Sequence, residues 1–336
     1  MVGLDIGTKT IKIVEVDKSG SGYGLSATGI VALSGTLPNK IEDEKEIAEI
    51  SQIIKKLHKE AGISSRDCAI SLPEQQVFTR TIRFPLLTDS EIASAIKWEA
   101  EQYIPIPVSE AIIQHLILER NEKSIPSGVT VLLVAAPRTV VEKCVKIVQS
   151  ANLNPVIVET ELMALCRSLA PSDKTVLLID FGANSTDIAI AKNGLLSFSR
   201  SIPIAGEAFT RAVSQNLGVS PMQAEEYKKT YGLASAQLEG KIKGALDPIL
   251  RMVVDEVIKA IHYYQQEEKG DIPGAVIISG GTSGMPEIIS TISGLLGMEV
   301  VIGNPFSKLS VDPDVAKKLS PYAPLYAVAV GLAMHE

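Results

Sequence analysis

VGLDIGTKTIKIVEV, at residues 2–16, is an apolar strand that ends at Asp5, a turn that contains Gly7, and a second strand with alternating apolar residues. A similar sequence, LIDFGANSTDIAIA, occupies residues 178–191, where Asp180 stands in the position of Asp5. Alternation with a period of two indicates strands, and a glycine between two such runs indicates a hairpin. The sequence therefore predicts two equivalent hairpins, one in each of two lobes, that face a common cleft.

The turns of both hairpins suit the phosphates of a nucleotide. Gly7 and Gly182 permit a close approach of backbone N–H groups to an anion. Asp5 and Asp180 supply hard oxygen ligands, acting through water, for the Mg²⁺ that accompanies nucleotide phosphates. Lys9 adds a positive charge beside the outer phosphates. One such turn alone is more typical of a plain β-turn, but two copies with matching flanks favour a nucleotide site.

A third glycine-rich segment, residues 275–287, reads AVIISGGTSGMPE. An apolar strand is followed by the pair Gly280 and Gly281 and then by a predicted helix start. Glycines let a flat ligand lie against bare backbone, and a helix N-terminus favours negative charge. Taken by itself, this segment is more typical of an ordinary glycine-rich strand-to-helix loop.

Composition and charge exclude several classes of protein. The chain has 336 residues, more than one compact domain usually carries, and 46% of them are hydrophobic. Its 32 basic and 39 acidic residues give a net charge of −7, which disfavours a nucleic-acid binder. The four histidines lack metal-ligand spacing, and neither a GxxxxGK[ST] nor a GxSxG motif occurs.

Cysteine usage and apolar runs are typical of a cytoplasmic protein. Cys68, Cys144 and Cys166 are odd in number and form no CxxC, which indicates reduced thiols. The longest apolar runs, Val129–Pro137 and Ala323–Met334, are shorter than the roughly 18 residues of a spanning helix. No secretion signal is expected. The chain opens almost directly into a strand, which leaves open whether a short leader was trimmed.

Hydrophobic periodicity predicts the order of the secondary structure. Strands are predicted at 2–6, 11–16, 23–33, 69–72, 76–84, 112–119, 129–135, 156–158, 175–179, 187–191, 195–202, 275–279 and 299–302. Helices are predicted over about 47–61, 89–103, 141–148, 162–169 and 250–264. Residues 303–324 are predicted to be a loop, and Trp98 is predicted to pack in the core, with a partner contact as the alternative. Hairpins mixed with crossover helices favour an α/β protein with mixed sheets.

The order of the three glycine-containing segments resembles the phosphate-1, phosphate-2 and adenosine motifs of the actin/Hsp70/sugar-kinase superfamily. Within it, the chain resembles the PilM family of type IV pilus assembly, which is related to the cell-division protein FtsA. The segments that carry this resemblance span nearly the whole chain: 3–16, 83–107, 206–210, 224–228, 231–232 and 278–284.

The resemblance implies an α/β, actin-like fold (actin/Hsp70/FtsA) with two lobes, four subdomains and an FtsA-type inserted subdomain. The first lobe would comprise 1–66, 154–172 and 323–336, and the inserted subdomain 67–153. The second lobe would comprise 173–205 and 270–322, and a helical subdomain at 206–269 would cap the nucleotide.

The resemblance also implies ATP and Mg²⁺ as cofactors and assigns the residues that bind them. Those that face the phosphates and Mg²⁺ would be Asp5, Gly7, Thr8, Lys9, Asp180, Gly182 and Ser185, with Asp5 and Asp180 holding the metal through water. Those around the ribose, base and adenosine would be Gly206, Glu225, Lys228, Gly280, Gly281 and Ser283. Without the family pattern, a solvated i,i+3 helix pair is the favoured interpretation of Glu225 and Lys228.

Hydrolysis is expected to be slow at most. Ala183 and Asn184 stand where the fast ATPases of the superfamily have consecutive glycines, which narrows the room around the outer phosphates. No catalytic residue is assigned from the sequence.

The implied function is that of a cytoplasmic ATP-binding scaffold in type IV pilus assembly. It would recruit the N-terminal cytoplasmic segment of a PilN-like inner-membrane partner to a groove with one wall at 67–153. The chain ends without the amphipathic helix of FtsA, so we expect peripheral attachment through the partner and no direct membrane insertion. Self-association stays open. The alternatives are an FtsA-like filament-forming cytoskeletal protein and a small-molecule kinase of the sugar-kinase group.

Overall fold

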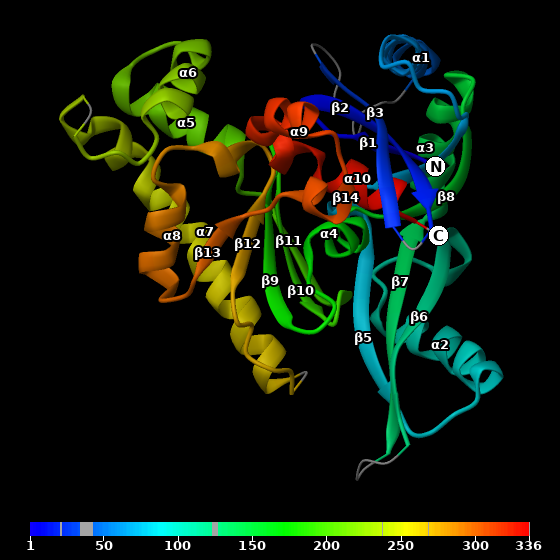
Figure 1. Cartoon of the computed structure of the whole chain (residues 1–336). Helices are drawn as coiled ribbons and strands as arrows, with labels where there is room; N and C mark the ends of the chain where they lie inside the picture. The colour runs from blue at the N-terminus through cyan, green and yellow to red at the C-terminus, as the bar shows by residue number, and fades with distance from the viewer. Residues whose placement is uncertain (21, 34–42, 123–126, 237, 268, 336) are drawn as a thin grey trace.

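The computed structural model describes residues 1–20, 22–33, 43–122, 127–236, 238–267 and 269–335 (Figure 1). Its first sheet has the strand order β14-β3-β2-β1-β4-β8. The bounds are β1 Val2–Ile6, β2 Thr10–Ser19, β3 Gly22–Ala32, β4 Asp67–Leu72, β8 Asn154–Thr160 and β14 Leu309–Ser310. Strands β1, β2 and β3 form an antiparallel meander, while β1, β4 and β8 run parallel.

The second sheet repeats this arrangement in the order β11-β10-β9-β12-β13. The bounds are β9 Thr175–Phe181, β10 Thr186–Lys192, β11 Leu195–Ile202, β12 Val276–Ser279 and β13 Val300–Ile302. Here β9, β10 and β11 form the meander, and β9, β12 and β13 are parallel. The β1–β2 and β9–β10 hairpins therefore occupy equivalent positions, which confirms the two matching hairpins that the sequence predicts.

Two helices, α4 (Glu161–Leu169) and α10 (Ala327–Ala333), form a layer between the sheets. Their side chains share one core with residues of both sheets, among them Ala69 and Leu178. The packing is close because the residues are small: a Cβ atom at Gly331 would overlap the carbonyl oxygen of Ala164. We refer to the elements around the first sheet as the first lobe and to those around the second sheet as the second lobe.

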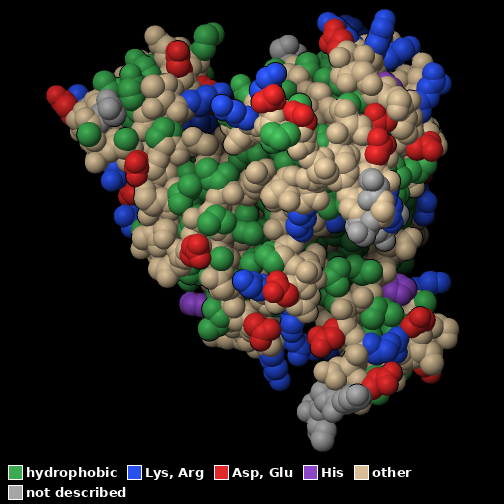
Figure 2. Space-filling model, viewed as in Figure 1, with side chains coloured by type: hydrophobic (Ala, Val, Ile, Leu, Met, Phe, Trp, Pro, Cys, Tyr) green, Lys and Arg blue, Asp and Glu red, His purple; other side chains and the backbone are tan. Residues whose placement is uncertain are grey.

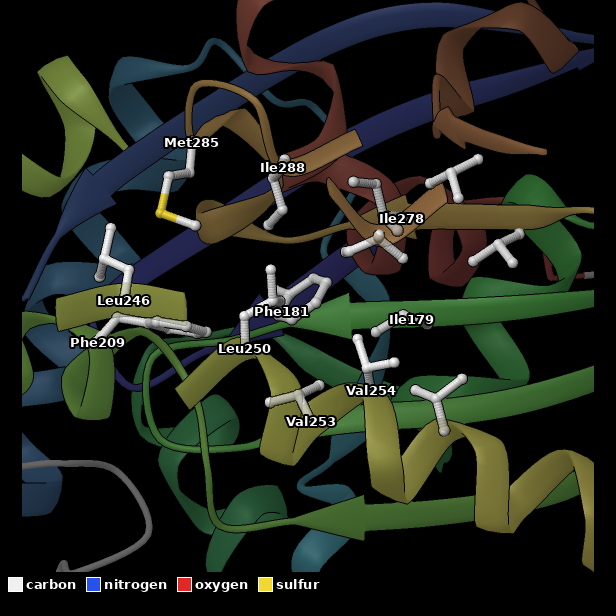
Figure 3. Packing of buried hydrophobic residues seen from close by; sticks show 14 of the residues in the cluster. Ile179, Phe181, Phe209, Leu246, Leu250, Val253, Val254, Ile278, Met285 and Ile288 are labelled. Carbon is white, nitrogen blue, oxygen red and sulfur yellow. The ribbon is translucent and has the colours of Figure 1, made fainter. Parts of the chain in front are cut away.

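Other helices pack outside the two sheets. On the first lobe these are α1 (Glu44–Glu60) and α3 (Arg138–Ser150). On the second lobe they are α5 (Gly206–Leu217), α6 (Pro221–Tyr231), α7 (Lys241–Gln266) and α8 (Ile288–Leu296). Figure 3 shows Phe181 of β9 and Phe209 of α5 packed beside Leu246 and Leu250 of α7. Each of these four side chains is fully buried, which stabilises the fold by about 1.5–3 kcal/mol per side chain.

The insert is a three-stranded sheet, β5-β7-β6, with one helix beside it. Its bounds are β5 Phe78–Phe84, α2 Asp89–Tyr103, β6 Ala111–Asn121 and β7 Gly128–Pro137. The predicted inserted subdomain, 67–153, is too wide, because β4 pairs with β1 and β8 and α3 packs on the first sheet. The sequence could not assign β4 to the first sheet, because an apolar strand has the same pattern in the first sheet and in the sheet of the insert.

The prediction that Trp98 lies in the core is wrong. Its side chain is 73% exposed on α2, because Ile92, Ile96 and Ala100 form the stripe that packs on the insert sheet. Trp98 lies two positions after Ile96, and two positions on a helix turn a side chain to the far side.

The prediction of a loop over 303–324 is also wrong. Three short helices and a strand lie there or begin there: η6 Pro305–Lys308, β14, α9 Pro313–Leu319 and η7 Ser320–Tyr326. These elements are too short to show periodicity, and their signals are local, namely Asn304 and Asp312 as N-caps, each followed by proline. Because β14 pairs with β3, the predicted second-lobe segment 270–322 includes residues of the first sheet. The other subdomain bounds stay a prediction.

Within the described residues, every helix is either too short or too polar to cross a membrane.

Candidate functional site

The first hairpin places a lysine directly opposite its aspartate. Asp5 on β1 pairs in register with Lys12 on β2, and Lys12 Nζ donates to Asp5 Oδ2 at 2.9 Å. The side chains are 11% exposed for Lys12 and 6% for Asp5. Burial acts to lower the pKa of Lys12, but the charge of Asp5, its hydrogen bond and the charge of Asp180 outweigh burial and raise that pKa. Lys12 is therefore a buried, fully charged cation at the hairpin.

Sequence reasoning missed Lys12 and chose Lys9 instead. The Lys9 side chain is 57% exposed, and its Nζ lies 2.7 Å from a carboxylate oxygen of Glu207 on α5. Lys9 thus forms an ion pair between the first hairpin and the second lobe. The signal for Lys12 was present in the sequence, because counting strand pairs outward from the turn between Ile6 and Ile11 places it opposite Asp5.

The second hairpin has an acid where the first has a lysine. Asp187 on β10 pairs in register with Asp180 on β9. Asp180 accepts a hydrogen bond from Ser279 Oγ at 2.6 Å, and Asp187 accepts from Ser185 Oγ at 2.9 Å and from Ser201 Oγ. Burial raises the pKa of Asp180, and it raises the pKa of Asp187 to about 7. The hydroxyl of Ser185 is therefore hydrogen-bonded to the carboxylate of Asp187.

Two further carboxylates lie beside these hairpins, and the sequence did not single them out. Glu161 is the first residue of α4, and its Oε2 accepts from the backbone N–H of Glu74 at 3.1 Å. Glu74 lies on η2 (Glu74–Gln76), just before the insert. Burial, followed by the charge of Asp187, raises the pKa of Glu74 to about 8 and lifts that of Glu161 well above its usual range.

The donor set fits a hydrated Mg²⁺. Besides the carboxylates of Asp5 and Asp180, the amide oxygen Oδ1 of Asn184 is buried without a hydrogen-bond partner among the described residues. Water molecules on a Mg²⁺ ion would donate to such oxygens, and Mg²⁺ keeps several of its waters when bound. After burial, the charge of Asp5 also raises the pKa of Asp180, as expected for two carboxylates on neighbouring hairpins.

The glycine-rich segment after β12 presents bare backbone in a form that differs from the prediction. Gly281 to Gly284 form a 3₁₀ turn, η5, and α8 begins only at Ile288, so no α-helix N-terminus follows the glycine pair directly. Gly281 and Gly284 are exposed, and a Cβ atom at Gly284 would meet nothing within 4 Å. Ser283 is buried, and its hydroxyl donates to the Gly280 carbonyl at 2.7 Å.

Gly280 itself is required by packing. Its φ of 82° lies in the region that favours glycine, and a Cβ atom there would overlap the carbonyl oxygen of Phe181. Gly280 therefore lets β12 lie tightly against β9, at the point where the turn begins.

The predicted cap residues form one network on α5 and α6. Lys228 Nζ donates to the Gly206 carbonyl at 3.1 Å and to Thr210 Oγ1 at 3.0 Å, and it lies 2.6 Å from a Glu225 oxygen. Burial favours a higher pKa for Glu225, but hydrogen bonds from Lys228 and Thr210 outweigh it and lower that pKa to about 2. Because Lys228 is only 5% exposed, the solvated-pair interpretation is wrong.

The structure brings the predicted residues from both lobes to one region. The backbone N–H of Gly206 donates to the Gly182 carbonyl at 3.1 Å, which joins the cap to the second hairpin. In the first hairpin, the Gly7 N–H donates to the Thr10 carbonyl at 3.1 Å, and half-buried Thr8 lies within the turn. Figure 2 shows the surface notched between the α5–α6 unit and the first lobe. That these residues bind a nucleotide stays a prediction.

The raised pKa values predict that the Mg²⁺-free protein loses stability as the pH rises from about 6 to 8.5. Glu74 titrates near pH 8 in the folded protein and near 4 in the unfolded chain, so the folded state binds the extra proton. The stabilisation that this proton gives is complete below the pKa of Glu74 in the unfolded chain, and it is lost as the pH rises through the pKa of Glu74 in the folded protein.

Replacing Glu74 with glutamine should remove about 2–3 kcal/mol of that pH dependence, because the amide stays neutral. The measurement is the melting temperature of wild type and Glu74→Gln across this pH range. Glu101→Gln, at an exposed position of α2, is the matched control. An identical pH slope in all three proteins would show that Glu74 does not hold a proton near neutral pH.

Comparison with known proteins agrees with this geometry. The family model described as type IV pilus assembly protein PilM matches residues 3–336. The solved PilM-PilN type IV pilus biogenesis complex has a chain with 28% identity and a TM-score of 0.84, covering 99% of this chain and 97% of that one. The cell division protein FtsA of Pseudomonas aeruginosa is 24% identical, covering 100% of this chain and 88% of that protein.

A more distant match to a solved structure supports the assignment of the fold only. MreB5 of Spiroplasma citri, solved with AMPPNP, has 15% identity and a TM-score of 0.57, covering 98% of this chain and 93% of that one.

Proposed function

The chain belongs to the PilM family of type IV pilus assembly proteins, and on this basis we propose that it binds ATP with Mg²⁺ between its two lobes and holds a PilN-like partner at the inner membrane. The actin-like fold supplies the scaffold for both tasks. Attachment to the membrane would be peripheral, through the partner.

The observation that carries the nucleotide proposal is the buried Lys12–Asp5 pair opposite Asp180. Lys12 supplies a fixed positive charge for phosphate oxygens. Because its side chain is largely buried, little water screens this charge and its attraction for the phosphate is strong. Asp5 and Asp180 would hold the hydrated Mg²⁺, which neutralises phosphate charge when it is bound. Exposed Gly281 and Gly284 offer backbone for the adenosine, and the Glu225–Lys228 network sets the position of the cap.

The partner segment is proposed to lie in a groove between the first lobe and the insert. A cavity of about 30 Å³ is located where the chain enters and leaves the insert, lined in part by Ile6, Gln76, Val140 and Cys144. A hollow of this size accepts one small apolar group. An extended peptide recognised in this way gains main-chain hydrogen bonds, and alternate side chains fill pockets.

The peptide groove predicts that Val140→Glu weakens partner binding at least tenfold, because the longer side chain would fill the small hollow and exclude the partner's side chain. The measurement is a titration of the purified protein with a synthetic peptide of the PilN N-terminal cytoplasmic segment. Val301→Glu makes the same change at a 40% exposed position of β13 in the second lobe and should leave binding unchanged. Equal affinity of both variants and wild type would place the groove elsewhere.

A filament-forming role is the second candidate, because several FtsA proteins match this chain at 21–26% identity. ATP turnover is proposed to be slow in either case, since Ala183 and Asn184 occupy the second phosphate turn. No finding favours the small-molecule kinase alternative.

A further inference from the structure

The outer side of α2 carries a large aromatic side chain that does not contribute to the core. Trp98 is 73% exposed, and it is the only tryptophan of the chain. Tryptophan side chains in folded proteins are highly buried on average. Figure 1 shows α2 on the side of the insert that faces away from the second lobe. The indole ring of Trp98 is therefore open to a binding partner.

The residues around Trp98 leave this ring uncovered. Its neighbours within about 60° around the helix axis are Glu91, Ser94, Ala95, Glu101 and Gln102. We refer to Trp98 and these neighbours as the Trp98 face. The residues one turn before Trp98, at 94 and 95, have side chains too small to cover an indole ring.

The charged side chains of the Trp98 face are both acidic. Glu91 and Glu101 are exposed, and neither forms an ion pair within the described part of the chain. Hydrogen bonds from the backbone N–H and the hydroxyl of Thr88 lower the pKa of Glu91, so this side chain keeps its negative charge. Lys97, the one cation of α2, lies about 100° away around the axis. An indole ring flanked by carboxylates is an environment that attracts a cation.

The helix is held firmly, so the Trp98 face has a fixed shape. The stripe of α2 opposite Trp98 is buried in the core of the insert. At the first turn, Asp89 lies 2.6 Å from Arg120 of β6. At the last turn, the guanidinium carbon of Arg80 lies 3.7 Å from the centre of the Tyr103 ring. Binding to a surface that is already ordered loses less conformational entropy.

We propose that the Trp98 face binds the basic, membrane-proximal part of the cytoplasmic segment of the PilN-like partner. This inference rests on the proposed function, which places such a partner at the inner membrane. Cytoplasmic segments next to a membrane-spanning helix carry an excess of Lys and Arg, and that charge complements Glu91 and Glu101. One cation would lie over the indole of Trp98, since tryptophan is the aromatic residue that binds cations best.

The Trp98 face is separate from the apolar hollow at Val140, so the partner would be held at two places. Exposed, rigid tryptophans are enriched among the residues that dominate the binding energy of protein interfaces. We therefore expect the hollow to select an apolar side chain of the partner and the Trp98 face to select its charge.

The test titrates the full chain with two synthetic peptides, both free of tryptophan. The basic peptide is the whole cytoplasmic N-terminal segment of the partner. In the neutral peptide, each Lys and Arg of the membrane-proximal half is replaced with glutamine. Because Trp98 is the only tryptophan of the chain, its fluorescence reports on this surface directly. The basic peptide should change the emission and bind about tenfold more tightly at low salt, and this advantage should shrink as salt is added.

Three variants are then titrated with the basic peptide by calorimetry. Trp98→Ala should raise the dissociation constant about tenfold, and Glu101→Lys should raise it several-fold because it places a like charge beside the bound cation. Met222→Ala is the matched control. It removes an apolar side chain that is 82% exposed on α6 of the second lobe, and it should leave the affinity unchanged.

The outcomes separate this inference from the proposed function. Equal affinity of the two peptides, with unchanged Trp98 emission, overturns the inference but not the peptide groove. Absence of binding by either peptide contradicts both the inference and the proposed partner. Self-association of the chain that Trp98→Ala abolishes while peptide affinity stays the same would assign the face to a second copy, and it would overturn the inference as well.

Discussion

Replacing Lys12 with methionine is expected to abolish the stabilisation that Mg-ATP gives the wild-type protein. At a nucleotide concentration about 100-fold above Kd, that stabilisation is about 2.7 kcal/mol, which corresponds to several degrees of melting temperature. Methionine keeps most of the side-chain length but removes the buried positive charge. The measurement is a thermal unfolding curve with and without Mg-ATP.

The Lys12→Met variant also leaves Asp5 buried and unpaired, which by itself costs about 3–5 kcal/mol of stability. The double variant Asp5→Asn, Lys12→Met removes both charges and should recover much of that loss while still failing to respond to Mg-ATP. Lys9→Met is the matched control: its lysine is largely exposed, so most of the nucleotide response should remain. A full response in Lys12→Met would show that the phosphates lie away from this hairpin.

Replacing Gly331 with alanine is expected to destabilise the protein by about 3 kcal/mol or more. The new methyl group would overlap the carbonyl oxygen of Ala164, where α10 crosses α4. On its other side α10 meets β1, because a Cβ atom at Gly3 would overlap the Ala329 carbonyl oxygen. The helix therefore has no direction in which to move without opening the core between the lobes. Thermal unfolding followed by circular dichroism measures the effect.

Gly244→Ala is the control for this prediction. Gly244 is an exposed residue of α7, and a Cβ atom there would meet nothing within 4 Å. Alanine should stabilise the helix by a few tenths to about 1 kcal/mol, since glycine has the lower helix propensity. If Gly331→Ala melts at or above the wild-type temperature, α10 and α4 are not tightly packed at this glycine.

Local patterns in the sequence account for most of the secondary structure and for the two hairpins. Each predicted strand occurs, and α2 has the predicted bounds of 89 and 103, because alternation and helical spacing act over a few residues. The two hairpins, with Gly7 and Gly182 in their turns, could also be predicted from the sequence, since a hairpin depends on its own turn residues. Counting strand pairs across the turn of the first hairpin would also have predicted that Lys12 lies opposite Asp5.

Tertiary packing decided the features that depend on residues far apart in the chain. Glu74 and Glu161 are separated by 87 positions and meet only because η2 packs against α4. Their raised pKa values follow from shared burial, which no local pattern encodes. In the same way, β4 belongs to the first sheet because it pairs with β1 and β8, which lie far from it or beyond the insert in the sequence. Sequence periodicity shows which face of an element is apolar, but which partner covers that face depends on how the whole chain packs.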